Sequence, residues 1–216
     1  MPKGKFVIGL DFDNTLVSYD DAMYQAALEL KLISRGIAVQ NKKQIRDYIR
    51  KLPSGEIKWQ ILQAEVYGKR MHKAKLMDGA KEFLKNCKGE GIKTFIISHK
   101  TKYAAQDKEK VNLQEVALNW MKENHFFDKS SLGLLEDRVY FEVTRNKKVA
   151  RIKTLKCTHF VDDLLEIFHD KAFPQEAVQM LFSPLKNPDE NLEIKRGIRI
   201  FRSWRDINNY FFVNLK

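Results

Sequence analysis

The sequence has few of the residues that mark several protein classes. Its 216 residues include only two cysteines, Cys87 and Cys157, which lie far apart and match no metal-ligand spacing. We therefore expect reduced, mostly buried thiols. No run approaches about 18 apolar residues, and Asp11 interrupts the apolar stretch near the N-terminus, so we expect neither a signal peptide nor a membrane span. These absences favour a cytoplasmic protein without a membrane partner.

The charge is strongly biased toward basic residues. Lysine and arginine number 39 against 28 acidic residues, which gives a formal net charge of +11. Such an excess permits nucleic acid, an acidic membrane surface or an anionic small substrate as a partner, and it equally fits a lysine-rich solvated surface. The hydrophobic fraction of 44%, with 14 Phe and 3 Trp, is sufficient for a packed core. The length suits one domain, or one domain with an insertion.

Apolar runs of strand length recur along the chain. Five of them are predicted as strands, at 6–12, 93–99, 158–164, 177–183 and 198–204. Because they are nearly continuous rather than alternating, they indicate strands buried on both faces. Helical patterns lie between them, at 78–91, 111–127 and 149–155. This alternation predicts an α/β fold, with a parallel central sheet and helices on both faces.

One region breaks the alternation. Residues 18–77 contain no convincing strand but three helical patterns, at 18–36, 41–52 and 55–70. The first pattern opens with Ser18 and Asp21, which have the spacing of a capping box. Sixty helical residues are too many for one crossover, so we predict a small helical subdomain inserted in a core of residues 1–17 and 78–216.

Acidic, hydroxyl and basic side chains follow the strands at their carboxyl ends, where α/β sheets bind ligands. The set comprises Asp11, Asp13 and Thr15 after the first strand, Ser98, His99 and Lys100 at the end of the second, Asp162 and Asp163 at the end of the third, and Lys147 and Lys148 ahead of the helix before it. Asp11 and Asp13 lie on alternate residues and are expected on one face.

The residue types predict phosphoester chemistry. Four neighbouring carboxylates repel one another unless a cation binds, and hard oxygen ligands without His or Cys suit Mg²⁺. A carboxylate beside the cation can attack phosphorus, and a second acid can move the proton. A serine and a lysine are suitable donors to the phosphoryl oxygens.

Four motifs resemble those of the haloacid dehalogenase superfamily. They are "DFDNTLV" (11–17), Ser98 closing "TFIIS", a lysine before a helix, and "FVDD" (160–163). The resemblance covers residues 5 to about 167. It implies a Rossmann-like three-layer sandwich, Mg²⁺ as cofactor, an aspartyl-phosphate intermediate, and a cap formed by the helical insertion.

The resemblance also implies roles for single residues. Asp11 would be the nucleophile and a metal ligand, and Asp13 the general acid/base that gives the metal its backbone carbonyl. Asp162 and Asp163 would complete the Mg²⁺ site. The phosphate-binding candidates are Thr15, Ser98, His99 and one lysine. That lysine stays open among Lys147, Lys148 and Lys153; Lys148 is preferred because it opens the helix that leads into the last motif strand.

The predicted function is a Mg²⁺-dependent phosphatase acting on a small phosphorylated metabolite, either a sugar phosphate or a nucleotide. Asp13 favours phosphoester over carbon–halogen chemistry, since dehalogenases of this superfamily lack an acid there. A nucleic-acid end phosphatase, a phosphomutase and a non-enzymatic binding protein are the alternatives. A nucleic-acid partner is not expected, because no nucleic-acid-binding motif is present and a cap restricts access. The sequence does not indicate the oligomeric state or the cap residues that select the substrate.

Overall fold

The computed structural model describes residues 6–39, 41–184 and 197–213, which divide into two compact units. The sheet unit contains the described residues up to Val17, Leu76–Lys100, and those from His125 onward. The helical unit contains Ser18–Lys75 and Thr101–Asn124. The chain therefore passes between the units four times, and the helical unit is built from two separate insertions into the sheet unit.

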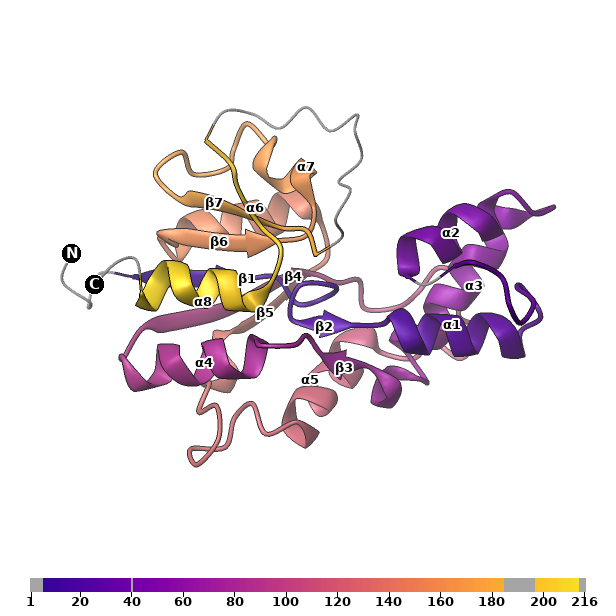
Figure 1. The fold of residues 1–216 in the computed structure, drawn as a ribbon, viewed down its shortest axis with the longest axis horizontal. Helices are drawn as coiled ribbons and strands as arrows, with labels where there is room; N and C mark the ends of the chain where they lie inside the picture. The colour runs from indigo at the N-terminus through magenta and orange to yellow at the C-terminus, as the bar shows by residue number, and fades with distance from the viewer. Residues whose placement is uncertain (1–5, 40, 185–196, 214–216) are drawn as a thin grey trace. The chain divides into compact units, whose positions relative to one another are not determined.

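Six parallel strands form the central sheet, in the order β5–β4–β1–β6–β7–β8 (Figure 1). They are β1 (Val7–Leu10), β4 (Lys93–His99), β5 (Val139–Glu142), β6 (His159–Asp162), β7 (Val178–Phe182) and β8 (Arg199–Phe201). Five of these strands lie within the predicted apolar runs. Strand β5 was not predicted, because this half-buried edge strand offers no long apolar run. The predicted α/β fold with a parallel sheet is confirmed.

Helices cover both faces of this sheet (Figure 1). On one face, α4 (Ala80–Gly89) packs against α8 (Trp204–Phe212), and the ring of Phe83 lies 5.1 Å from that of Trp204. On the other face, α6 (Arg145–Thr154) and α7 (Leu165–Phe168) contribute to a buried cluster with Phe95 and Ile97 of β4. A 3₁₀ turn, η3 (Glu136–Arg138), precedes β5.

Both cysteines lie in this packed interior, as predicted. Cys87 and Cys157 are free and buried. Burial raises the pKa of each thiol to about 12, which keeps both in the unreactive protonated form at neutral pH.

The helical unit consists of α1 (Asp20–Glu29), α2 (Lys42–Arg50), α3 (Gly55–Tyr67), a 3₁₀ turn η2 (Met71–Lys73) and α5 (Leu113–Glu123). The first three helices pack against one another, and α5 packs against α3 and η2. The indole Nε1 of Trp120 in α5 donates a hydrogen bond to the carbonyl of Ala74. The pattern of residues 111–127 indicates a helix but not that it packs with the first insertion.

The start and the end of the first helix differ from the prediction. The helix begins after Tyr19, and the Ser18 hydroxyl accepts from the N–H of Asp20 at 3.4 Å rather than from that of Asp21, so the expected capping box of Ser18 and Asp21 is wrong. Ser18 instead belongs to β2 (Val17–Ser18), which pairs with β3 (Lys75–Leu76) where the chain leaves and re-enters the sheet unit. The helix ends at Glu29, well before Gly36.

Among the described residues, no helix combines the length and the apolar composition needed to cross a membrane.

Candidate active site

The predicted site residues meet at one edge of the sheet because three neighbouring strands end there. In the register of the sheet, Leu10 of β1 pairs with Ile96 of β4 on one side and with Val161 of β6 on the other. Asp11, Ser98 and Asp162 follow these positions by one or two residues. The strand order also reverses beside β1, which places the residues at a topological switch point of the sheet.

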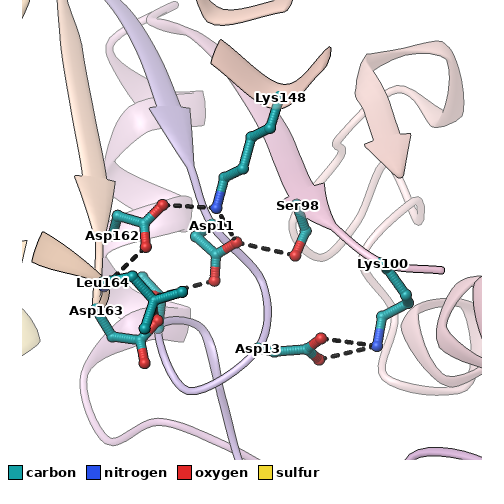
Figure 2. A network of polar contacts seen from close by, with 9 residues as sticks. Asp11, Asp13, Ser98, Lys100, Lys148, Asp162, Asp163 and Leu164 are labelled. Atoms are coloured by element: carbon teal, nitrogen blue, oxygen red, sulfur yellow. Dashed lines mark hydrogen bonds and ion pairs between the residues drawn. The ribbon is translucent and has the colours of Figure 1, made fainter. Parts of the chain in front are cut away.

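Asp11 lies at the centre of the site and is 4% exposed. Its Oδ1 accepts a 2.9 Å hydrogen bond from the Ser98 hydroxyl and a 2.6 Å contact from the Lys148 ammonium (Figure 2). Its Oδ2 lies 3.3 Å from the hydroxyl of Thr15. Its backbone N–H donates to the carbonyl of Val161, which fixes the start of the loop against β6. Several donors therefore hold one carboxylate in a single orientation.

Lys148 connects this carboxylate to Asp162. Its ammonium is 1% exposed and lies 2.6 Å from both Asp11 and Asp162 (Figure 2). Burial by itself lowers the pKa of Lys148, but the two carboxylates outweigh this effect and raise it overall, so the side chain remains charged. Thr144 caps α6 and sets the position of Lys148 in its first turn. Among the three candidate lysines, Lys147 and Lys153 are exposed, and Lys148 alone is placed in the cluster.

Three carboxylates lie close enough to hold one metal ion. Oxygen atoms of Asp11, Asp162 and Asp163 lie within 4.8 Å of one another. The backbone N–H of Leu164 donates to Asp162 Oδ1, and the Thr15 hydroxyl lies 3.4 Å from Asp163 Oδ1. Burial, with the nearby charge of Asp11, raises the pKa of Asp162. Lys148 neutralises only one of three negative charges, and an all-oxygen donor set suits a hard divalent cation such as Mg²⁺. The residues present therefore fit the implied metal.

Asp13 lies on the same loop but is held apart from this cluster. Both of its carboxylate oxygens contact the ammonium of Lys100, at 3.0 and 2.8 Å (Figure 2). The loop turns sharply at Asn14, whose φ is +60°, a left-handed conformation that asparagine tolerates better than most residues. Asn14 N–H donates to Val17 O, which closes the turn. Because β1 ends at Leu10, strand alternation does not set the direction of the Asp13 side chain.

The structure brings most of the predicted site residues together but leaves His99 outside the cluster. It brings together Asp11, Thr15, Ser98, Lys148, Asp162 and Asp163. His99 is exposed and does not join them, because successive residues of β4 point to opposite faces and Ser98 takes the inner one. The same alternation turns Lys100 inward. Lys100 was included among the polar residues at the strand ends but was given no role in the site, although this period-two pattern was a usable signal for it.

Comparisons with known proteins agree at the level of the fold. Neither protein-family models nor curated proteins give a match. Solved structures do match along nearly the whole chain, and many are haloacid dehalogenase-superfamily hydrolases. A haloacid dehalogenase-like hydrolase from Streptococcus pneumoniae is 16% identical with a TM-score of 0.60, covering 98% of this chain and all of its own.

Two further neighbours share this fold. YfnB from Bacillus subtilis, whose structure contains magnesium, is 11% identical with a TM-score of 0.55, covering 97% of this chain and 100% of its own. A dehalogenase is 13% identical with a TM-score of 0.53, covering 94% of this chain and 95% of its own. At these identities the likeness shows the fold alone, which this chain shares with these hydrolases.

Proposed function

We propose that this chain is a Mg²⁺-dependent phosphomonoester hydrolase that acts through an aspartyl-phosphate on Asp11. The observation that carries the proposal is the shared position of Asp11, which contacts Ser98 and Lys148 and also lies within metal-sharing distance of Asp162 and Asp163. A nucleophilic carboxylate needs positive charge and hydrogen-bond donors around the group that it attacks, and this site supplies both.

The first half of the reaction transfers the phosphoryl group to the enzyme. A carboxylate oxygen of Asp11 attacks phosphorus while the bond from phosphorus to the leaving oxygen breaks. Asp13, two residues along the same loop, gives a proton to that oxygen, so the product leaves as an alcohol. Ser98 and Lys148 donate to the phosphoryl oxygens, whose charge is spread over the transition state.

The second half returns the enzyme to its starting state. Asp13 takes a proton from a water molecule, the water oxygen bonds to phosphorus, and the bond between phosphorus and Asp11 breaks. Phosphate is released and Asp13 is protonated again. Asp11, Asp162 and Asp163 would hold the Mg²⁺ ion, which would supply charge neutralisation for the incoming phosphate. Lys148 holds the carboxylates of Asp11 and Asp162 in place throughout.

The helical unit is proposed to act as a cap that selects a small substrate, such as a sugar phosphate or a nucleotide. It is assembled from insertions after Val17 and after Lys100, and these insertion points follow the loop that carries Asp13 and the strand that carries Ser98 by a few residues. Short stretches of chain thereby connect the cap to the segments that carry these two residues. We also propose that the protein is located in the cytoplasm.

Carbon–halogen hydrolysis is the competing chemistry, since one structural neighbour is a dehalogenase. Asp13 argues against it, because a halide leaves without a proton and needs no acid at that position. The paired acids Asp11 and Asp13 are what a poor alkoxide leaving group requires.

The decisive experiment is a panel of phosphoesters, 2-haloacids and 5′- and 3′-phosphorylated oligonucleotides, assayed with Mg²⁺ and with EDTA. We expect phosphate release from small esters only, lost in EDTA and in Asp11→Asn. Intact-protein mass spectrometry of quenched reactions should show a phosphate adduct, absent in Asp11→Asn. Halide release, or activity confined to oligonucleotide ends, would refute the proposal. Transfer of phosphate to a second sugar instead of water would identify a phosphomutase. Asp137→Asn, at an exposed carboxylate, is the matched control.

A further inference from the structure

Lys100 is a buried cation that the proposed reaction does not use directly. Its side chain is 3% exposed, and both oxygens of Asp13 contact its ammonium, at 3.0 and 2.8 Å. The side chain of Asp13 is itself only 19% exposed. Burying a lysine is costly unless the charge is paired, so this pair is a built feature rather than a surface contact.

The surroundings of Lys100 fix its ammonium in place. Its backbone N–H donates a 2.9 Å hydrogen bond to the carbonyl of Glu142, which continues the pairing of β4 with β5 past the end of the strand. Its ammonium lies 5.8 Å from the centre of the Phe12 ring, and Phe12 is fully buried. Backbone, ring and carboxylate together leave this side chain little freedom.

The contact with Lys100 sets the direction in which the Asp13 carboxylate points. Two buried ammonium groups lie near the loop, and they pair with different carboxylates. Lys148 forms ion pairs with Asp11 and Asp162, whereas Lys100 forms an ion pair with Asp13 (Figure 2). Without Lys100, the carboxylate of Asp13 would be attracted to Lys148, the other buried cation beside this loop. It would then compete with the nucleophile instead of facing the leaving group.

We propose that Lys100 is a positioning residue that holds Asp13 in the direction needed for proton transfer and away from the Lys148 cluster. This inference rests on the proposed phosphoester hydrolysis and adds a residue that acts through Asp13. The two-point contact holds the ionised carboxylate, the form that takes the proton from water, against rotation. When Asp13 carries the proton for the leaving group, its other oxygen still accepts from Lys100.

The test compares two esters that differ in their need for a proton. An alkyl phosphate requires acid assistance for its leaving group, whereas 4-nitrophenyl phosphate releases a stable phenolate without it. We expect Lys100→Met to lower kcat/KM about 100-fold for the alkyl ester and less than about 3-fold for the aryl ester. Lys100→Arg should recover part of the alkyl activity, since it keeps a two-point donor. Lys93→Met, at the opposite end of β4, is the matched control and should change neither ester.

A double variant distinguishes loss of the Lys100 contact with Asp13 from a folding defect caused by an unpaired buried charge. Asp13→Asn with Lys100→Met leaves no unpaired charge, and it should be no slower on the alkyl ester than Asp13→Asn alone. Equal losses for both esters in Lys100→Met, or additive losses in the double variant, would overturn the inference. If the wild-type protein hydrolyses neither ester, the proposed function fails and this inference with it. If Asp13→Asn discriminates between the esters and Lys100→Met does not, only the role of Lys100 is wrong.

Discussion

The indole Nε1 of Trp204 donates a 2.9 Å hydrogen bond to the backbone carbonyl of Thr15, across 189 positions of sequence. Both residues are fully buried. Trp204 is the first residue of α8. Thr15 lies on the loop that follows β1, and its hydroxyl contacts Asp11 and Asp163. The last helix of the sheet unit thus anchors the loop that carries the proposed nucleophile.

Trp204→Phe should therefore affect both stability and the metal site. Phenylalanine keeps most of the packing but leaves the carbonyl of Thr15 buried without its donor, which costs about 1–3 kcal/mol. We expect that loss in urea unfolding, together with an approximately 10-fold weaker affinity for Mg²⁺ by calorimetry. Trp120→Phe is a matched control, because it removes an indole hydrogen bond to the carbonyl of Ala74 in the helical unit. It should cost similar stability but leave the Mg²⁺ affinity unchanged; an equal loss of affinity in both variants would contradict the prediction.

Removing the charge of Lys148 should destabilise the protein strongly. Lys148→Met leaves Asp11 and Asp162 as neighbouring buried carboxylates without a cation, and breaking such a group by removing one partner costs about 3–5 kcal/mol. Urea unfolding at pH 7.5 in EDTA measures this directly. Lys147→Met, at the adjacent exposed position, should change the free energy of unfolding by less than about 0.5 kcal/mol. Similar losses in the two variants would show that Lys148 does not compensate the carboxylates.

Divalent cations should stabilise the folded protein through the three carboxylates. At a Mg²⁺ concentration 100 times its Kd, binding to the native state alone adds about 2.7 kcal/mol to the free energy of unfolding. We expect Tm to rise with Mg²⁺ in the wild-type protein and in Asp137→Asn, whose carboxylate is exposed and lies outside the cluster. Asp163→Asn removes one charged oxygen ligand and should show a much smaller rise at the same concentration. Identical curves for the two variants would place the ion elsewhere.

The fold and the centre of the site were predictable from sequence for one physical reason. Parallel strands buried on both faces are nearly continuous apolar runs, and the polar residue that ends such a run must lie at the sheet edge. Asp11, Ser98 and Asp162 each end a run of this kind, so their meeting follows once the strands are adjacent. The sheet register confirms this placement of the three residues.

Other features depend on packing that a local pattern does not encode. The amphipathic pattern of α5 reports an apolar face but not the partner that covers it, so its place in the helical unit could not be inferred. Strand β5 has only three consecutive apolar or aromatic residues, 139–141, before Glu142, so it lacks the long apolar run of a strand buried on both faces. Asp13 was assigned to the face of Asp11 by strand alternation, but the strand ends at Leu10 and the following turn redirects the chain.

His159 of β6 illustrates how this packing affects proton binding. The hydroxyl of Thr158 accepts from the N–H of Val7 and donates to its carbonyl, at 3.0 and 3.1 Å. Because that hydroxyl has only one proton, the 2.9 Å contact with His159 requires Nδ1 to be the donor. Nε2 lies 3.5 Å from the Tyr210 hydroxyl, which donates to it when the imidazole is neutral. Burial of the ring, which is 6% exposed, favours this neutral form.

The free energy of unfolding should decrease as the pH is lowered, because His159 resists protonation in the folded protein. Burial, with the charge of Arg199 adding to it, lowers the pKa of His159 from 6.5 to about 4. The unfolded chain binds the proton below about pH 6.5 and the folded protein only near pH 4, so the free energy of unfolding decreases as pH falls through this window. Between pH 7.5 and 4.5 this group alone removes about 2–3 kcal/mol. His159→Phe, although less stable at pH 7.5, should lose that much less over the same interval in urea unfolding. His72→Phe changes an exposed imidazole and should retain the wild-type slope. If His159→Phe also retains the wild-type slope, burial does not keep His159 neutral in the folded protein and the prediction is wrong.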